Sequence, residues 1–255
     1  MYRISYTSPS GRTWKLESGK NRGVFLAPEG ITGMSGDAED NALTSVGIPG
    51  QQFSTLTIKP LTGALTTTIV PTEDTNIAQL LARWRADWSR TTPGTLTIAA
   101  PTGVLTTQVR LAAAIDPPKK QPNKAKTLSI TTQITADSGL WKNQPTTHHG
   151  AATIHNPGDV ITWPTIAWTQ SDTLTLPSGA TITLPEATTQ KILSLNPIDS
   201  RIVTNTDGTP DQDTWQKVAP GLIPEGIPPG QYRTFKATKT TTSITCSCFF
   251  LDPWR

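Results

Sequence analysis

Threonine is the residue that most constrains what this chain can fold into, since 45 of its 255 residues are threonine. A β-branched side chain loses rotamer freedom in a helix and packs well on the pleated, half-exposed surface of a strand. The 22 prolines and 19 glycines supply the turns that separate many short strands. The sequence therefore predicts a mainly β protein, and its length predicts two domains, each with its own core.

The net charge of the chain is small, at +3 near neutral pH. Lys and Arg are not interleaved with aromatic residues, as they are in a groove that follows a phosphate backbone. The densest basic group lies among prolines, where it is typical of a solvated loop or linker; it consists of Lys119, Lys120, Lys124 and Lys126. We therefore expect no specific nucleic-acid binding. The first ten residues are polar and no apolar run approaches the ~20 residues of a membrane span, so we expect no signal peptide, no membrane segment and synthesis in a cytoplasm.

One segment of the first half has the periodicity of a helix. Its apolar residues fall on a single helical face over 76–89, and they are Ile77, Leu80, Leu81, Trp84 and Trp88. Asp74 or Thr75 is the expected N-cap. Strands are expected at 56–61, 64–70, 95–99, 104–115 and 126–135, with a break at Thr62-Gly63 and a hairpin turn at Pro101-Thr102-Gly103. We expect the helix to lie across one face of this sheet.

The polar run 140–150 has no periodicity and marks the expected boundary between a domain at 1–145 and a domain at 146–255. Beyond it the pattern predicts strands only. They are expected at 152–155, 165–169, 173–176, 181–184, 191–195, 201–204 and within 232–251, with turns at Pro177-Ser178-Gly179 and Asp207-Gly208. Strands spaced by about eight to twelve residues are typical of a sandwich or a jelly roll.

No group of residues predicts a catalytic, cofactor or metal site. His148, His149 and His155 lie close together, but no further ligand stands at a standard metal-site spacing, so an exposed linker is the favoured interpretation. The acidic residues that a glycosidase pair would require lie in turns or at unrelated positions; they are Asp199, Asp207, Asp211, Asp213 and Glu225. The sequence also has no Gly-x-Ser-x-Gly motif and no phosphate-binding Gly-rich loop before a helix.

Cysteine and tryptophan are the remaining candidates for chemistry. Cys246 and Cys248 are two residues apart on an expected strand, where a disulfide would be strained, so two reduced thiols are expected. Among the eight tryptophans, those at 84 and 88 belong to the helix, and most others border strands. Trp163, Trp168 and Trp215 are the candidates for stacking on a sugar ring.

Several motifs follow one another along nearly the whole chain. In the first half, the Gly-rich loop 30–52 precedes paired strands, the helix at 76–89, and the segment 92–96 that leads into Pro101-Thr102-Gly103. The second half adds the segments 156–160, 163–164, 198–201, 215–217, 227–230 and 253–255. Each motif is weak alone, but their order resembles that of the distal tail (Dit) proteins of phages with long, non-contractile tails. The similarity is to the minor tail proteins of phages that infect actinobacteria, and the first 25 residues match least.

This resemblance implies a function in assembly and no enzymatic activity. It implies an N-terminal ring domain, sandwich- or barrel-like with one helix, and a C-terminal galectin-like β-sandwich. Proteins of this family form a hexameric ring at the distal end of the tail in the virion, around the channel for DNA. The implied partners are other copies of the chain, the tail tube protein, the tail-tip protein and the tape measure protein. No cofactor is implied.

The segment 30–52 is the expected contact with a neighbouring ring or tube, because it is long, Gly-rich and has no core pattern. Its candidate residues are Gly30, Ile31, Gly33, Met34, Pro49 and Gly50. Two alternatives stay open. One is a module that binds host-wall carbohydrate through the three tryptophans named above, and a glycan array tests it. The other is a cell-wall hydrolase, which a zymogram on host peptidoglycan tests.

Overall fold

The computed structural model describes residues 2–17, 22–47, 49–199 and 202–254. The chain forms two compact units. Unit 1 consists of Met1–Lys142 and Phe250–Arg255, and unit 2 consists of Asn143–Phe249. The expected mainly β fold is confirmed, since 46% of the described residues are in strands and 9% are in helices. The C-terminal segment belongs to unit 1, whereas the sequence analysis assigns it to the second domain.

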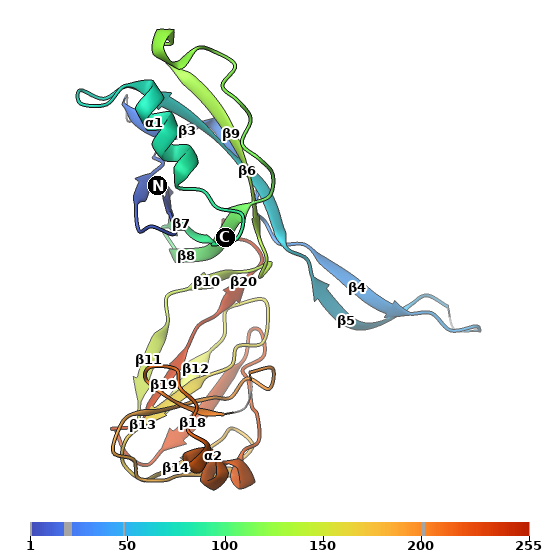
Figure 1. Ribbon diagram of the computed structural model, residues 1–255. Helices are drawn as coiled ribbons and strands as arrows, with labels where there is room; N and C mark the ends of the chain where they lie inside the picture. Colours follow the sequence, from blue (N-terminus) through green and yellow to red (C-terminus); the bar gives the residue numbers. More distant parts are fainter. Residues whose placement is uncertain (1, 18–21, 48, 200–201, 255) are drawn as a thin grey trace. The chain divides into compact units, whose positions relative to one another are not determined.

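Unit 1 is built on one large antiparallel sheet (Figure 1). Its strands are β1 (Arg3–Thr7), β2 (Thr13–Lys15), β3 (Gly23–Gly33), β6 (Leu61–Val70), β7 (Gly94–Ala100), β8 (Gly103–Leu111), β9 (Leu128–Ala136), β10 (Trp141–Asn143) and β20 (Phe249–Phe250). The main path runs β2-β1-β7-β8-β9-β6-β3. Strand β8 pairs with β7 up to Val109 and then with β9 through Arg110 and Leu111, so it carries the sheet from one half to the other. The expected hairpin of strands 95–99 and 104–115 is confirmed, although its second strand ends at Leu111.

The helix α1 (Ile77–Ala86) lies against this sheet. Its buried side chains are Ile77, Leu80, Leu81 and Trp84, as the periodicity predicts. The indole N–H of Trp84 donates to the Thr132 hydroxyl of β9 at 3.1 Å. The N-cap expected at Asp74 or Thr75 is wrong. Asn76 caps the helix instead, because its side-chain oxygen accepts from the Gln79 N–H at 2.9 Å while the Gln79 side chain accepts from the Asn76 N–H.

An aromatic cluster around Asp87 joins the end of α1 to the first strands. The Tyr6 and Trp88 rings stack with centroids 3.8 Å apart, and Trp14 meets Trp84 edge to face. The Trp14 indole N–H donates to the buried Asp87 carboxylate at 2.7 Å, and the Tyr6 hydroxyl donates to the Asp87 carbonyl at 2.9 Å. Burial, with the nearby carboxylate second, raises the pKa of Tyr6. The neutral phenol therefore stays a hydrogen-bond donor in the core of unit 1.

Unit 2 is a β-sandwich. One sheet has the order β11-β19-β13-β16-β17 and the other has the order β12-β18-β14-β15. The strands are β11 (Thr146–His149), β12 (Ala151–His155), β13 (Thr165–Trp168), β14 (Asp172–Thr175), β15 (Thr181–Leu184), β16 (Lys191–Ser194), β17 (Val203–Asn205), β18 (Tyr232–Ala237) and β19 (Ser243–Cys246). Side chains from both sheets form the core between them, among them Ile154, Phe235, Trp168, Leu193 and Ile244.

Two expectations for the second half are wrong. The run 140–150 is not an unstructured linker, because β10 and β11 occupy most of it and His148 and His149 pair with β19. The expectation of strands only also fails, since α2 (Gln212–Val218) follows the turn at Asp207-Gly208. Asp211 caps α2 by accepting from a backbone N–H of the first turn at 3.0 Å. The remaining helical pieces are short 3-10 turns, η1 (Pro122–Lys124) and η2 (Ala219–Gly221).

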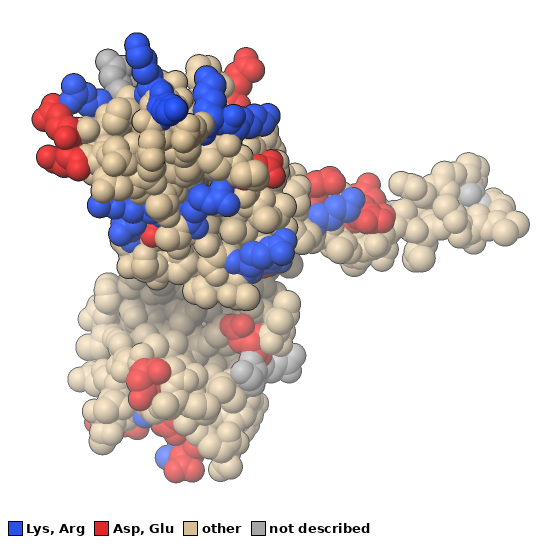
Figure 2. Space-filling model, turned by 45° about the horizontal axis from the view of Figure 1, so that its top comes forward, with Lys and Arg blue, Asp and Glu red and all other residues tan. Residues whose placement is uncertain are grey.

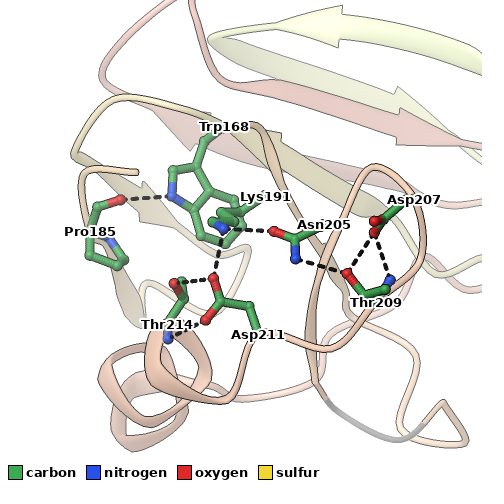
Figure 3. Close-up of polar contacts among 8 residues, drawn as sticks. All are labelled: Trp168, Pro185, Lys191, Asn205, Asp207, Thr209, Asp211 and Thr214. Atoms are coloured by element: carbon green, nitrogen blue, oxygen red, sulfur yellow. Dashed lines mark hydrogen bonds and ion pairs between the residues drawn. The ribbon is translucent and has the colours of Figure 1, made fainter. Parts of the chain in front are cut away.

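A buried ion pair ties α2 to the five-stranded sheet (Figure 3). The Lys191 ammonium lies 2.7 Å from the Asp211 carboxylate and donates to the Asn205 side chain at 2.7 Å. The hydrogen bond from Lys191, with those from Thr214, holds the pKa of Asp211 below its usual range. Asp207 instead accepts from Thr209 within its own turn. The carboxylates of Asp207 and Asp211 therefore accept hydrogen bonds that hold this turn and the start of α2 in place.

Candidate assembly surface

The segment between β3 and β6 forms a two-stranded antiparallel ribbon that projects from unit 1 (Figure 1). Its strands are β4 (Ala38–Leu43) and β5 (Gln52–Ile58), paired from Ala38↔Ile58 to Leu43↔Gln52. We call residues 38–58 the arm. It pairs with no other sheet among the described residues. The expectation of an irregular loop at 30–52 is therefore wrong: this segment is the end of β3, one strand of the arm and the turn at its tip.

The outer part of the arm carries no charged residue from Asn41 to Ile58. Figure 2 shows this difference, with acidic and basic side chains at the base of the arm and none along the rest. Three apolar side chains of the arm are exposed: Leu43 by 65%, Leu56 by 51% and Val46 fully. Natural proteins usually place charges on exposed strand edges to prevent pairing with other chains. An uncharged ribbon with open edges and apolar side chains is instead typical of a surface that is covered in an assembly.

The base of the arm is fixed to the core of unit 1. Met34 is completely buried, and its carbonyl accepts from the Trp141 indole N–H at 2.8 Å. Gly33, the last residue of β3, has φ 68°, and a Cβ there would lie 2.2 Å from a carbonyl oxygen of β6. Only glycine therefore fits at this position. On the other strand, the Lys59 N–H donates to the Asp37 carbonyl at 2.9 Å. The arm therefore leaves unit 1 from a rigid base.

The residues predicted for the contact fall into two groups. Gly30, Ile31 and Gly33 lie in β3, where Gly30 is buried and packs closely against β6, and Met34 is a core residue. Pro49 and Gly50 lie at the exposed tip of the arm. Sequence reasoning missed the two arm strands because the expected strand 56–61 joins residues of two different sheets. Three of the four residues at 55–58 are β-branched, which was the signal for β5, and Pro60 lies between the end of β5 and the start of β6.

The candidate sugar-stacking tryptophans are not gathered on one surface. Trp168 is completely buried, and its indole N–H donates to the Pro185 carbonyl at 2.9 Å, so it cannot stack on a ligand from solvent (Figure 3). Trp215 is half-buried and packs against the core of unit 2. Trp163 is also half-buried and lies close to Gly226.

The thiols and the histidines form no recognised site. Cys246 and Cys248 are free thiols, as expected, and both are buried; a hydrogen bond from the Cys246 thiol lowers the pKa of Cys248. Among the described residues, no cluster of three or more His, Cys, Asp or Glu side chains is placed to hold a metal ion. Neither helix in the described part of the chain has the length and apolar character needed to cross a bilayer.

No protein-family model matches the sequence, and no curated protein sequence matches it. Solved structures do match. One is the Dit protein of phage SPP1, described as a paradigm of the hub adsorption apparatus in phages that infect Gram-positive bacteria. It has a TM-score of 0.65 and 14% identity, with 98% of this chain and 99% of that chain covered.

Two others are chains of the phage P2 baseplate in its activated conformation, one with Ca and one with Sr. Each has a TM-score of 0.52 and 11% identity, with 97% of this chain and 98% of that chain covered. At such identities the likeness concerns the fold alone. The chain has, over nearly its whole length, the fold of the SPP1 Dit protein.

Proposed function

We propose that this protein is a structural subunit of a phage tail tip, which forms a hexameric ring between the tail tube and the tip or baseplate proteins. The observation that carries the proposal is the arm, a two-stranded ribbon in a chain with the Dit fold, whose outer part is uncharged and whose base is fixed to the core of unit 1. The neighbours of known structure are described as hub and baseplate proteins. A structural function also accounts for a chain whose carboxylates serve as caps and ion-pair partners.

The physical properties of the arm favour a contact with another copy of the chain. A two-stranded hairpin on its own is at best marginally stable in water, so the arm gains from a partner that covers its side chains or extends its sheet. A ring requires head-to-tail interfaces, in which one patch of each subunit meets a different patch of the next. An arm that projects from the body suits such an interface, because it reaches past its own subunit.

The position of the protein in the virion follows from the same proposal. The ring would lie at the distal end of the tail, in contact with the tube protein, the tail-tip protein and the tape measure protein, around a central channel for DNA. The net charge of +3 is small, which agrees with a channel that lets DNA pass without holding it. Catalytic activity is not part of the proposal.

Three substitutions on the arm test the proposal: Leu43→Asp, Val46→Asp and Leu56→Asp in one chain. Each places a charge on an exposed apolar position, so the subunit itself is expected to fold as before. The wild-type chain is expected to form rings with six subunits, measured by native mass spectrometry and by electron microscopy of purified protein and of tails. The triple variant is expected to remain monomeric and to be absent from tails.

The matched control is Ile198→Asp, which changes an apolar side chain that is 90% exposed and belongs to unit 2, not to the arm. This variant is expected to form rings as the wild type does. Rings that form equally well with the triple variant would refute the arm as the contact. A wild-type chain absent from tail-tip rings in virions would refute the ring itself.

A further inference from the structure

The outer face of the four-stranded sheet in unit 2 presents an array of threonines. In this sheet, alternate residues point into the core, and those between them point to solvent. Leu174, Ile182 and Phe235 are among the inward residues and are completely buried. The outward positions include Thr153, Thr173, Thr175, Thr181, Thr183 and Thr234, all exposed or half-buried. We call this surface the threonine face.

The strand register arranges these threonines in rows. Thr173 faces Thr183 and Thr175 faces Thr181 between β14 and β15, and Thr153 faces Thr234 between β12 and β18. The hydroxyls of Thr153 and Thr234 are hydrogen bonded at 2.8 Å. Strands lie about 4.8 Å apart and alternate residues about 6.7 Å apart, so the hydroxyls form regular rows with roughly these spacings.

An aromatic pair stands at one end of the same face. His155 and Tyr232 occupy the next outward pair of the β12–β18 ladder, beside Thr153 and Thr234. Their rings are stacked, with centroids 4.3 Å apart and planes at 19°. Tyr232 remains 64% exposed, so the side of its ring away from His155 is open to solvent.

The outward positions of this face carry a positive charge and no negative charge. Lys236 is the charged residue at its outward positions, opposite Ala151. No Asp or Glu occupies an outward position of the four strands, since Asp172, their one acidic residue, is buried. A ligand that carries hydroxyl, acetamido or anionic groups would therefore meet no repulsion there.

We propose that the threonine face binds an extended polysaccharide, with the open side of the Tyr232 ring as its stacking platform. A threonine hydroxyl both donates and accepts, as a sugar hydroxyl does, and its stiff side chain loses little freedom on binding. An aromatic ring offers an apolar surface to the C–H face of a pyranose. A protein partner is disfavoured, since the centre of a stable protein interface is mostly apolar and aromatic, whereas here the centre is threonine.

This inference does not depend on the ring, because it uses residues of unit 2 alone. It also moves the sugar platform away from Trp163, Trp168 and Trp215, none of which is an outward residue of the four strands. If the protein forms rings and binds no polysaccharide, the threonine-face proposal fails and the ring proposal stands. If it binds polysaccharide and forms no ring, the threonine-face proposal stands and the ring proposal fails.

The test measures binding of the full chain to an array that carries glucans, galactans, mannans, arabinans and purified peptidoglycan. At least one of these is expected to bind the wild type. Tyr232→Ala is expected to weaken that binding by about tenfold or more, as truncation of an aromatic anchor does. A second variant, Thr153→Val with Thr234→Val, keeps side-chain shape and strand propensity but removes two hydroxyls, and it is expected to weaken binding as well.

The control uses the matching hydroxyl pair on the opposite sheet of unit 2. Thr147 and Thr245 face each other between β11 and β19 and are hydrogen bonded at 2.9 Å. Thr147→Val with Thr245→Val is expected to bind as the wild type does. Three results would overturn the proposal: no binding to any polysaccharide, binding unchanged in both face variants, or an equal loss in the control. Circular dichroism of each variant verifies that the fold is intact.

Discussion

The buried carboxylate of Asp172 is expected to be a main stabiliser of unit 2. It is 6% exposed and accepts from the N–H groups of Thr173, Thr238 and Lys239 at 2.7, 3.1 and 3.1 Å. The hydroxyls of Thr238 and Thr242 also donate to it, the latter at 2.6 Å. One side chain thereby fixes the start of β14 to the turn between β18 and β19, 66 or more residues later.

Asp172→Asn keeps the shape of the side chain and replaces one of its oxygens by an NH₂ group. If the amide oxygen stays with Thr173 and Thr238, the NH₂ group faces the Lys239 N–H and the Thr242 hydroxyl. The hydroxyl can rotate and accept, but the N–H loses its acceptor at a cost of about 1–3 kcal/mol. Loss of the negative charge weakens the hydrogen bonds that remain by about 1 kcal/mol in total. We therefore expect the free energy of unfolding of unit 2 to fall by about 2–4 kcal/mol.

Native-state hydrogen exchange measures this change in unit 2 separately from unit 1. Amide exchange in β14 and β18 of the Asn variant is expected to be roughly 30- to 700-fold faster than in the wild type, at about 1.4 kcal/mol per tenfold. Asp213→Asn, at an exposed position, is the control and is expected to change exchange by less than about tenfold. Exchange in the Asp172 variant within about threefold of the wild type would refute the assignment of the carboxylate as a main stabiliser.

The pH dependence gives an independent measurement on the same side chain. Burial acts to raise the pKa of Asp172, but the hydrogen bonds from Thr238, Thr242 and the backbone outweigh it, so the pKa lies below its ordinary value of 3.8. A carboxyl with a lowered pKa in the folded state stabilises fully above its unfolded-state pKa. This stability is lost as the pH falls through the folded-state pKa. The wild type is therefore expected to lose more stability below pH ~4 than Asp172→Asn does.

Three further predictions concern other anchors of the fold. Lys191→Met leaves Asp211 partly buried without its cation and is expected to lower the stability of unit 2 by about 3 kcal/mol, seen as a lower midpoint of thermal unfolding; an unchanged midpoint would contradict the ion pair's role. Gly33→Ala is expected to cost about 2 kcal/mol or more in urea unfolding, because its Cβ meets a carbonyl of β6. Gly11→Ala, with open space around the Cβ, should cost less, and equal costs would count against this reasoning. Tyr6→Phe removes a buried hydroxyl that donates to a carbonyl and is expected to cost about 1–3 kcal/mol, measured in the same way; no loss would mean that the bond contributes nothing.

Sequence patterns predicted the elements whose formation depends on residues close together in the chain. The apolar spacing at 77–84 indicated α1, and the turn at Pro101-Thr102-Gly103 indicated the β7–β8 hairpin. The threonine content and regular turns predicted the sandwich of unit 2. Alternation alone could not separate β5 from β6, because both are rich in threonine and β-branched residues. Only the pairing of β6 with β3 and β9 shows which of them belongs to the core.

The candidate sites depended on contacts that no local pattern records. Trp168 and Trp215 carry the same ring, and only tertiary packing makes one of them completely buried. The His155–Tyr232 pair was missed because its members lie 77 positions apart and meet through strand pairing. Likewise, Asp87 lies near Trp14 only after the first strands fold against the end of α1.

The return of the chain to unit 1 at residue 250 sets the order in which the contacts at the base of the arm are completed. The Gly36 N–H, at the base of the arm, donates to the Leu251 carbonyl at 2.7 Å, and the Tyr2 hydroxyl donates to the Trp254 carbonyl at 2.8 Å. A chain cut short before Phe250 lacks both acceptors, although every strand of the arm has already been made. Translation therefore completes both strands of the arm before it completes the segment 250–254, which holds Gly36. In a chain truncated before Phe250, the base of the arm would be held only by contacts within the rest of unit 1, such as that between Trp141 and Met34.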